Sequence, residues 1–308
     1  MQKAPLVREL FDGPIDVVGD IHGEIDAVRC LLRHLGYSEH GDHNESRRLV
    51  FLGDLTDRGP DSPSVVALVR ALVESGRAQC VLGNHDLNLL LGHEKHDNGW
   101  FFGEGHRADG SPHPQVVADA ATREAVTGFF RSLPLALERT DVRVVHACWR
   151  GEMIDLARRA TDAIDLYRQH ASLIAEDHEG RTDLDKIDRG LERQNHNPVK
   201  VLTSGLEKRI DPPFLASGKW RQEERVRWWE GYEDSPWCAF GHYGLEFGQP
   251  TGHGRAICID YAVGRRWGER RAPGFDGSFR SRLGALRLPE EIVFFDDGER
   301  LPAASQIR

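Results

Sequence analysis

The sequence predicts an α/β fold in which the strands of the first half pair in parallel. Between the early strand-like runs, apolar residues recur at helical spacing over 24–35 and 63–75, which is typical of amphipathic helices. Strands that alternate with helices of this length indicate βαβ units, whose strands are parallel. The short, β-rich apolar runs lie at residues 15–18, 49–52, 80–82, 142–145, 238–240 and 256–259.

The helix over 63–75 has end signals of its own. Ser62 is the expected N-cap, Pro63 suits the first turn, and Gly76 follows the last periodic residue.

Further along, residues 93–114 have no sustained period and are rich in Gly and His, which predicts a long loop or lid. The histidines of this loop lack regular ligand spacing, so a solvated lid is favoured over a metal site.

Composition disfavours several classes of protein. The chain of 308 residues has a net charge of −9, which gives no electrostatic reason for broad binding to nucleic acid or anionic membranes. The five cysteines form no CxxC pair, which argues against a disulfide framework or a zinc knuckle and favours a reduced, cytoplasmic protein. No apolar run is long enough to cross a bilayer, and the N-terminus has no apolar signal core.

We expect a single domain that spans residues 1–308. Residues 151–235 separate two groups of strand-like runs, and residues 151–200 are polar and follow a helical pattern. Because strand-like runs resume afterwards, 151–235 is predicted to be a helical cap inserted within that domain.

Five of the strand-like runs are followed directly by side chains that can bind a metal ion. In open α/β sheets, sites form outside the carboxyl ends of the strands, so these side chains are expected to converge. Carboxylate, imidazole and amide groups without thiolate suit Mn²⁺, Fe or Zn²⁺ better than Mg²⁺ or Ca²⁺. Six ligands fit two ions about 4 Å apart that share one carboxylate, as in phosphoester hydrolysis. The candidate ligands are Asp20, His22, Asp54, Asn84, His146 and His242.

The motifs that follow the strand-like runs resemble those of a known family. GDIHG at 19–23, GDLTDRG at 53–59 and GNHD at 83–86 resemble the motifs of the calcineurin-like metallophosphoesterases. The resemblance is to the phosphoprotein phosphatase branch, which includes bacterial diadenosine tetraphosphatases, and HACW and GHYG resemble its two late histidine motifs. It spans residues 15–263 and implies a sandwich of two central β-sheets flanked by helices.

The resemblance also implies how the ligands divide between two divalent ions, with Mn²⁺ expected first and Fe or Zn²⁺ as alternatives. Asp54 would bridge the ions. One ion would be held by Asp20, His22 and His242, and the other by Asn84 and His146.

The same resemblance implies the catalytic roles. A hydroxide shared by the ions would attack phosphorus in line, and His85, oriented by Asp57, would protonate the leaving oxygen. Arg58 and Asn84 would hold phosphate oxygens, since the fork of an arginine matches that geometry.

Departures from the family pattern bear on the substrate. GNHD replaces the usual GNHE, and Asp86 is expected still to support its loop. There is no counterpart of the SAPNY stretch of eukaryotic protein phosphatases, and AICIDYAVG is closer to an LDTG-like stretch of the nucleotide-cleaving members. The expected substrate is therefore that of a diadenosine tetraphosphatase or of a broad-specificity phosphatase. The alternatives are a serine/threonine phosphoprotein, a nucleic-acid end, and a non-catalytic phosphate-binding regulatory module, which is disfavoured because no ligand or acid is missing.

Three further features leave alternatives open. Residues 264–282 combine six arginines with aromatic side chains, which suits a nucleotide or RNA end, although a solvated loop is favoured. Residues 219–229 either supply a further phosphate-binding arginine, Arg225 or Arg227, or pack tryptophans on a helix. Asp260 either supports a ligand histidine or caps a strand end.

Overall fold

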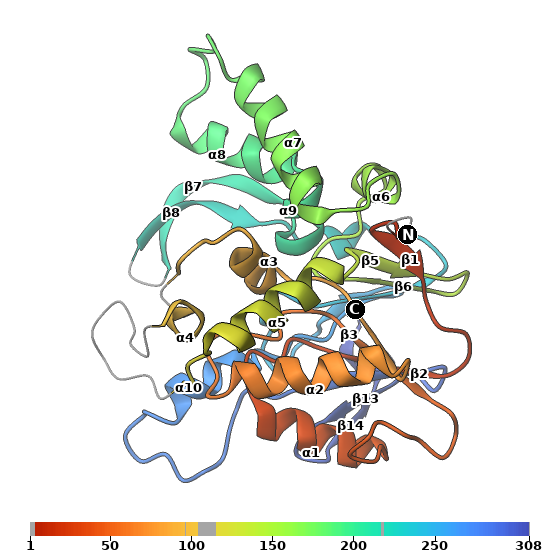
Figure 1. The fold of residues 1–308 in the computed structure, drawn as a ribbon. Helices are drawn as coiled ribbons and strands as arrows, with labels where there is room; N and C mark the ends of the chain where they lie inside the picture. Colours follow the sequence, from red (N-terminus) through yellow and green to blue (C-terminus); the bar gives the residue numbers. More distant parts are fainter. Residues whose placement is uncertain (1–3, 96, 104–114, 217–218, 308) are drawn as a thin grey trace.

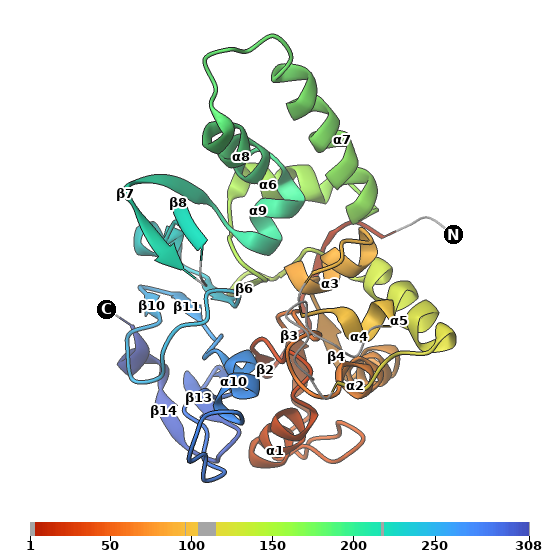
Figure 2. The same ribbon diagram turned by 90° about the vertical axis from the view of Figure 1, so that its left-hand side faces the viewer.

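A computed structural model describes residues 4–95, 97–103, 115–216 and 219–307 of the chain. Two six-stranded β-sheets face each other at its centre, and helices cover their outer faces (Figure 1). Figure 2 shows the same layers from the side. The predicted α/β sandwich of two sheets flanked by helices is confirmed.

One sheet contains the strands of the first half of the chain. β2 (Ile15–Val18), β3 (Arg48–Phe51) and β4 (Ala78–Cys80) lie side by side in parallel, as predicted. The helices α1 (Ile25–Leu35) and α2 (Ser62–Glu74) connect them. Beyond β2 the sheet continues with three antiparallel strands that the sequence did not predict, namely β12 (Gly284–Leu288), β13 (Ile292–Phe295) and β14 (Arg300–Pro302).

The second sheet is built around three parallel strands from the second half of the chain. β9 (Trp237–Phe240) lies between β6 (Val142–Val145) and β11 (Ala256–Cys258). Its remaining strands are β1 (Val7–Glu9), β5 (Ala136–Glu138) and β10 (Gly252–His253).

The strands are buried on both faces. Val17 and Val50 point into the space between the sheets, where they meet Val144 and Ile257 of the opposite sheet. Their neighbours along each strand, such as Phe51, pack instead under the helices. Because both faces are buried, the strands read as continuous apolar runs, and this is why the sequence revealed them.

The helices α3 (Asn84–Leu90), α4 (Gly99–Phe102) and α5 (Ala120–Ser132) follow β4, and α3 contacts α5. After β11 the chain forms two short turns of helix, η2 (Val263–Arg265) and α10 (Arg266–Glu269). A last short helix, η3 (Ala303–Gln306), follows β14.

The segment 151–235 lies together in the upper part of Figure 1, away from α1 and α2. It contains strands as well as helices, so it is not helical throughout. Its interpretation as a cap stays a prediction. Its elements are α6 (Gly151–Arg158), α7 (Ala163–Asp177), α8 (Lys186–Asn195), α9 (Pro198–Ser204), β7 (Glu207–Ala216), β8 (Lys219–Arg225) and η1 (Trp228–Gly231).

Two local predictions need correction. The N-cap of α2 is Asp61, whose side chain accepts a hydrogen bond from the backbone N–H of Ser64, and not Ser62, which is the first helical residue. The hydroxyl of Ser62 is already engaged, because it accepts from the backbone N–H of Asp57. The predicted loop over 93–114 contains the short helix α4, while residues 96 and 104–114, with three of its four histidines, lie outside the described residues.

None of the described helices has both the length and the apolar character that a membrane span requires.

All five cysteines lie in the described part of the chain as free thiols, and four of them are buried.

A buried ionic network closes the end of the first sheet that lies opposite the carboxyl ends of β2 and β3. Arg47 has a side chain only 1% exposed, and it donates to the carboxylates of Asp16 and Glu290 and to the carbonyl of Leu288. Arg287 donates to Asp16 as well. Since buried charges are tolerated only when paired, each member of this network depends on the others.

We predict that Arg47→Met lowers the free energy of unfolding by about 3 kcal/mol, because it removes one partner of a buried pair. Urea unfolding followed by circular dichroism measures this change. Arg70→Met is the matched control, since Arg70 pairs with Glu74 on the exposed side of α2 and its loss should cost less than about 1 kcal/mol. Equal losses in the two variants would contradict the prediction.

Candidate active site

Both sheets deliver polar side chains to one shared edge. β2, β3 and β4 end side by side in one sheet, and β6 and β9 end side by side in the other. Each of these five strands is followed by predicted site residues. The structure brings together all nine of them, namely Asp20, His22, Asp54, Asp57, Arg58, Asn84, His85, His146 and His242.

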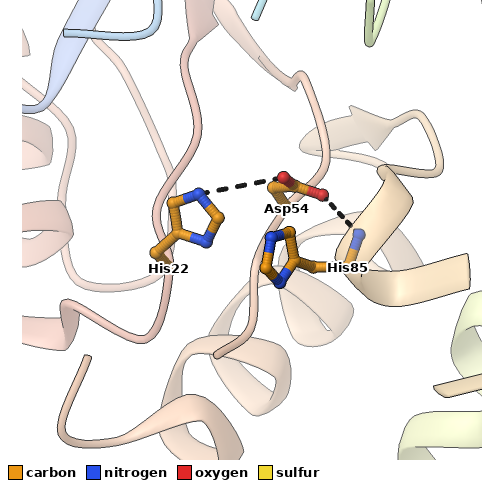
Figure 3. Close-up of side chains that lie close together, drawn as sticks. All are labelled: His22, Asp54 and His85. Atoms are coloured by element: carbon orange, nitrogen blue, oxygen red, sulfur yellow. Dashed lines mark hydrogen bonds and ion pairs between the residues drawn. The ribbon is translucent and has the colours of Figure 1, made fainter. Parts of the chain in front are cut away.

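The carboxylate of Asp54 lies at the centre of this edge and is buried. Its Oδ2 is 3.8 Å from Nε2 of His22, and its Oδ1 accepts from the backbone N–H of His85 at 2.9 Å (Figure 3). The same Oδ2 is 3.5 Å from Nε2 of His146. Nε2 of His22 is also 4.0 Å from the carboxylate of Asp20. One carboxylate therefore stands between imidazoles that come from different sheets.

Backbone carbonyls fix how two of these imidazoles are protonated. Nδ1 of His146 lies 2.6 Å from the carbonyl oxygen of Leu52, and Nδ1 of His22 lies 3.0 Å from that of Thr56. A carbonyl can only accept, so each Nδ1 carries a proton and donates it. In the neutral ring Nε2 then carries a lone pair, which is the form of histidine that binds metal ions.

The amide of Asn84 completes a second group of ligands. Its Oδ1 is 2.7 Å from Nδ1 of His242 and 3.2 Å from Nε2 of His146. Turned the other way, the amide would donate to both rings, so the inward oxygen needs either a proton on a facing ring nitrogen or a cation among the three groups. The donor set therefore fits a metal ion at this position.

The structure groups the side chains differently, in one respect, from the partition that the resemblance implied. His242 was expected with Asp20 and His22, but its ring lies with Asn84 and His146. Only the backbone N–H of His242 approaches Asp20, at 3.1 Å. The reason is that β6 and β9 are neighbours in one sheet, so the residues that follow them lie side by side.

The charges at the edge are strongly coupled. Burial raises the pKa of the Asp54 carboxyl, but His146 and His85 outweigh this and hold it well below its ordinary value. Burial lowers the pKa of His146, yet Asp54 and Asp20 raise it to about 10. Burial, with the Arg58 guanidinium, holds the pKa of His22 well below its ordinary value. A proton and a metal ion thus compete for the lone pairs that face Asp54.

His85 and Asp57 form a second, adjoining pair. Nδ1 of His85 is 2.7 Å from Oδ2 of Asp57, whose other oxygen accepts from the indole N–H of Trp100 at 2.7 Å. Burial lowers the pKa of His85, but the carboxylates of Asp54 and Asp57 outweigh it, so that the pKa lies above the ordinary value. A histidine held in this way is suited to donate a proton.

Two arginines reach the site. Arg58 donates from Nη1 and Nη2 to the Nε2 atoms of His22 and His85, at 3.1 and 3.0 Å. Arg225, at the end of β8, donates to the backbone carbonyl of His242 at 3.0 Å. Arg227 points elsewhere, to the exposed Glu230. Of the two arginines that the sequence offered, Arg225 is therefore the one at the site, and it lies on a strand rather than on a helix.

The loops of the site are held in uncommon backbone conformations. Eight described residues other than glycine have a positive φ, and the five that belong to the site are His22, Asp54, Asp57, Arg58 and His242. Such conformations persist only where the surroundings enforce them, and they cluster at functional sites. Here the backbone N–H groups of Ile21 and His22 both donate to the carbonyl of Asp54, which joins the loops after β2 and β3.

Two glycines allow the ligands to approach. A Cβ on Gly83 would lie 2.3 Å from Oδ1 of Asp54, and a Cβ on Gly241 would lie 2.0 Å from Oδ1 of Asp20. No side chain fits in that space.

Further carboxylates support the loops. Asp86 accepts from the backbone N–H groups of Leu55 and Gly83, which confirms that the shorter carboxylate of GNHD still supports its loop. Burial raises the pKa of Asp86 to about 7. Asp260 accepts from the backbone N–H groups of Gly244 and Ala262, so it holds the turn after His242 by its backbone.

Within the arginine-rich segment 264–282, several arginines have partners in the fold. Arg266 is buried and donates to Asp296, and Arg270 pairs with Glu24. These contacts favour a structural role for the segment over the binding of a nucleotide or an RNA end.

Sequence reasoning missed two residues that contact the site. Trp100 holds Asp57, and Asp97 lies 3.4 Å from Nε of Arg58. Both lie in the aperiodic loop, where no pattern distinguished them from a solvated lid. The aromatic run at residues 100–102, in a loop rich in polar residues and glycine, was the one available signal.

Comparison with protein families identifies the class. A model of the calcineurin-like phosphoesterases matches residues 13–243, which is most of the chain. The chain therefore belongs to the calcineurin-like phosphoesterase family, as its motifs predicted.

Curated relatives resemble part of the chain. An asymmetrical bis(5'-nucleosyl)-tetraphosphatase PrpE of Oceanobacillus iheyensis is 46% identical over 74 residues, which are 23% of this chain and 30% of the relative. Its counterpart in Bacillus subtilis is 45% identical over 73 residues, with the same coverage. A symmetrical bis(5'-nucleosyl)-tetraphosphatase of Pseudomonas syringae is 42% identical over 73 residues, 24% of this chain and 23% of the relative. The chain thus matches less than a third of the length of these relatives.

Solved structures share the fold. A cold-active protein-tyrosine phosphatase of a Shewanella species covers 97% of this chain with a TM-score of 0.57 and 17% identity, and 82% of that chain is matched. A protein serine/threonine phosphatase of Saccharomyces cerevisiae covers 94%, with a TM-score of 0.50 and 17% identity, and 78% of it is matched. The expected sandwich of the calcineurin-like family is confirmed, and family membership supports a hydrolase.

We predict that Gly241→Ala reduces Mn²⁺-supported hydrolysis of bis-p-nitrophenyl phosphate by about tenfold or more, because the new methyl group must displace Asp20. Gly128→Ala is the control, since a Cβ there meets nothing within 4 Å. Steady-state rates at equal concentrations of folded protein measure both. Activity that survives Gly241→Ala unchanged would show that the position of Asp20 does not matter.

Proposed function

We propose that the protein is a dinuclear, metal-dependent phosphoesterase that hydrolyses phosphomonoester or phosphoanhydride bonds. One observation carries this proposal, namely that the buried carboxylate of Asp54 lies between imidazoles of two different sheets, with their Nε2 atoms 3.8 and 3.5 Å from its Oδ2. Family membership supports the same reaction class.

In this proposal Asp54 bridges two divalent ions, with Mn²⁺ as the expected metal because the ligands are oxygen and nitrogen atoms. When bound, such a pair of ions supplies an activated water and neutralises charge on the phosphoryl group. The ligands of one ion are Asp20 and His22, and those of the other are Asn84, His146 and His242.

The remaining side chains bind phosphate and move the proton. Arg58 presents two N–H groups to the site, and we assign it to phosphate oxygens together with Asn84 and Arg225. His85, held by Asp57, protonates the leaving oxygen through Nε2 after the bound phosphate has drawn Arg58 away from that nitrogen. The carboxylates of Asp54 and Asp57 raise the pKa of His85 above the ordinary value, which favours the protonated ring.

The proposed substrate is a dinucleoside polyphosphate or a broad set of phosphate esters. The names of the curated relatives support a dinucleoside polyphosphate, although the chain matches only part of each relative.

We also propose that residues 151–235 form a cap over the substrate, since Arg225 connects this segment to the loop of His242. The free thiols support a cytoplasmic location.

A substrate panel with added Mn²⁺ tests the function. Diadenosine tetraphosphate, a phosphoserine peptide and RNA with a 5′ or 3′ phosphate are compared by phosphate release and by product analysis. The proposal expects hydrolysis with the dinucleotide preferred, while a preference for the peptide or RNA would favour those alternatives. Failure to hydrolyse any of these, or bis-p-nitrophenyl phosphate, would favour a non-catalytic phosphate-binding module.

We predict that Asp54→Asn loses bound Mn²⁺ and activity together, since it removes the negative charge shared by both ions. Asparagine tolerates the left-handed backbone of this position, so the fold should persist. Metal content after dialysis and the rate of hydrolysis measure the effect, with the exposed Asp12→Asn as control. A variant that keeps two ions and full activity would rule out the bridge.

We predict that His85→Ala keeps its metal but loses rate according to the leaving group. Phenyl phosphate, which needs a proton, should slow by about a hundredfold, and p-nitrophenyl phosphate by about tenfold or less. The exposed His253→Ala is the control. Equal losses on the two substrates would mean that His85 is not the general acid.

A further inference from the structure

We infer that Asp97 is a positioning residue that orients Arg58 for the binding of phosphate. The inference rests on the proposed function, because it concerns how the same site holds its substrate. No sequence motif includes Asp97, which lies in the loop that precedes α4.

The contacts of Arg58 divide its guanidinium into two sides. Nε lies 3.4 Å from Oδ2 of Asp97, whose side chain is only 11% exposed. Nη1 and Nη2 point instead toward His22 and His85. Asp97 therefore holds the arginine through Nε and leaves the two terminal nitrogens directed into the site, while the same oxygen of Asp97 lies 3.8 Å from Nδ1 of His85.

The loop that carries Asp97 is itself fixed. The next residue, Asn98, is buried, accepts from the backbone N–H of Lys95 and donates to the carbonyl of His93. Two residues further on, Trp100 is fully buried and donates to Asp57. The carboxylate of Asp97 is thus anchored on both sides and does not simply follow the arginine.

Arg58 is also packed closely along its aliphatic part. A Cβ on Gly264 would lie 2.9 Å from Cδ of Arg58 and 2.8 Å from Cδ2 of His22. The arginine is therefore restricted by packing as well as by the ion pair with Asp97, although its side chain is 36% exposed.

The direction of the effect follows from these contacts. A free arginine loses rotamer freedom when it binds phosphate, and an arginine that is already held does not. Because Asp97 contacts Nε and not the terminal nitrogens, phosphate can bind without displacing it. Removal of Asp97 should therefore weaken the binding of phosphate rather than strengthen it.

The experiment compares Asp97→Ala and Asp97→Asn with Glu94→Gln, which removes a charge from an exposed residue of the same loop. Two readings are taken in the presence of Mn²⁺. The first is KM and kcat for p-nitrophenyl phosphate. The second is the Kd of inorganic phosphate by calorimetry, which requires no turnover. Circular dichroism checks the fold, and the isosteric Asp97→Asn provides the reading if Asp97→Ala does not fold.

We expect Asp97→Ala to raise both KM and the phosphate Kd by about three- to tenfold while kcat stays within about threefold. Glu94→Gln should match the wild type. In an Arg58→Ala background, Asp97→Ala should add no further rise in the phosphate Kd, because that effect passes through the arginine, whereas an effect through His85, whose Nδ1 is 3.8 Å from Asp97, would change kcat.

An unchanged or lowered KM, a loss confined to kcat, or additive losses in the double variant would each overturn the inference. These outcomes are separate from a failure of the proposed function. If the proposed function fails, the wild type itself hydrolyses none of the substrates, and the Kd of inorganic phosphate still tests the role of Asp97.

Discussion

The placement of the Asp54 carboxylate is the constraint on which the rest of the site depends. It is buried, it faces imidazoles from both sheets, and it accepts a hydrogen bond from the first turn of α3. A lone carboxylate in such a place would be costly, so its surroundings must supply positive charge. Protons on the histidines do this in one state and, in the proposed function, two cations do it in another. The two sheets must therefore meet at this edge, since neither alone provides enough ligands.

The backbone around the site reflects this demand. Glycines stand where a side chain would strike Asp54 or Asp20, and three of the proposed ligands, His22, Asp54 and His242, adopt positive φ angles. The loop after β2 is bound to the loop after β3 through the carbonyl of Asp54. Strain of this kind persists only in a well-supported fold. The buried network around Arg47, at the opposite end of the same sheet, is one such support.

Much of this was readable in the sequence, and the failures have physical causes. Ligands that directly follow apolar strands are a local signal, so the six candidate ligands could be recognised in the sequence. The two-sheet layering and the roles of Asp57, Arg58 and His85 were expected from the resemblance of the motifs. The grouping of the His242 ring with Asn84 and His146 was not predicted, because it depends on the pairing of β6 with β9, which are far apart in the chain. Asp61 and Ser62 are both good caps, and only the contact of Ser62 with Asp57 decides between them. Asp97 and Trp100 act through tertiary contacts that leave no periodic pattern.

The electron paramagnetic resonance spectrum of the protein with two equivalents of Mn²⁺ tests the central claim most directly. Two Mn²⁺ ions that share the carboxylate of Asp54 at a separation of about 4 Å are coupled through their spins. We predict the spectrum of an exchange-coupled pair. The six-line spectrum of isolated ions at this loading, or binding of a single ion, would contradict a dinuclear centre bridged by Asp54.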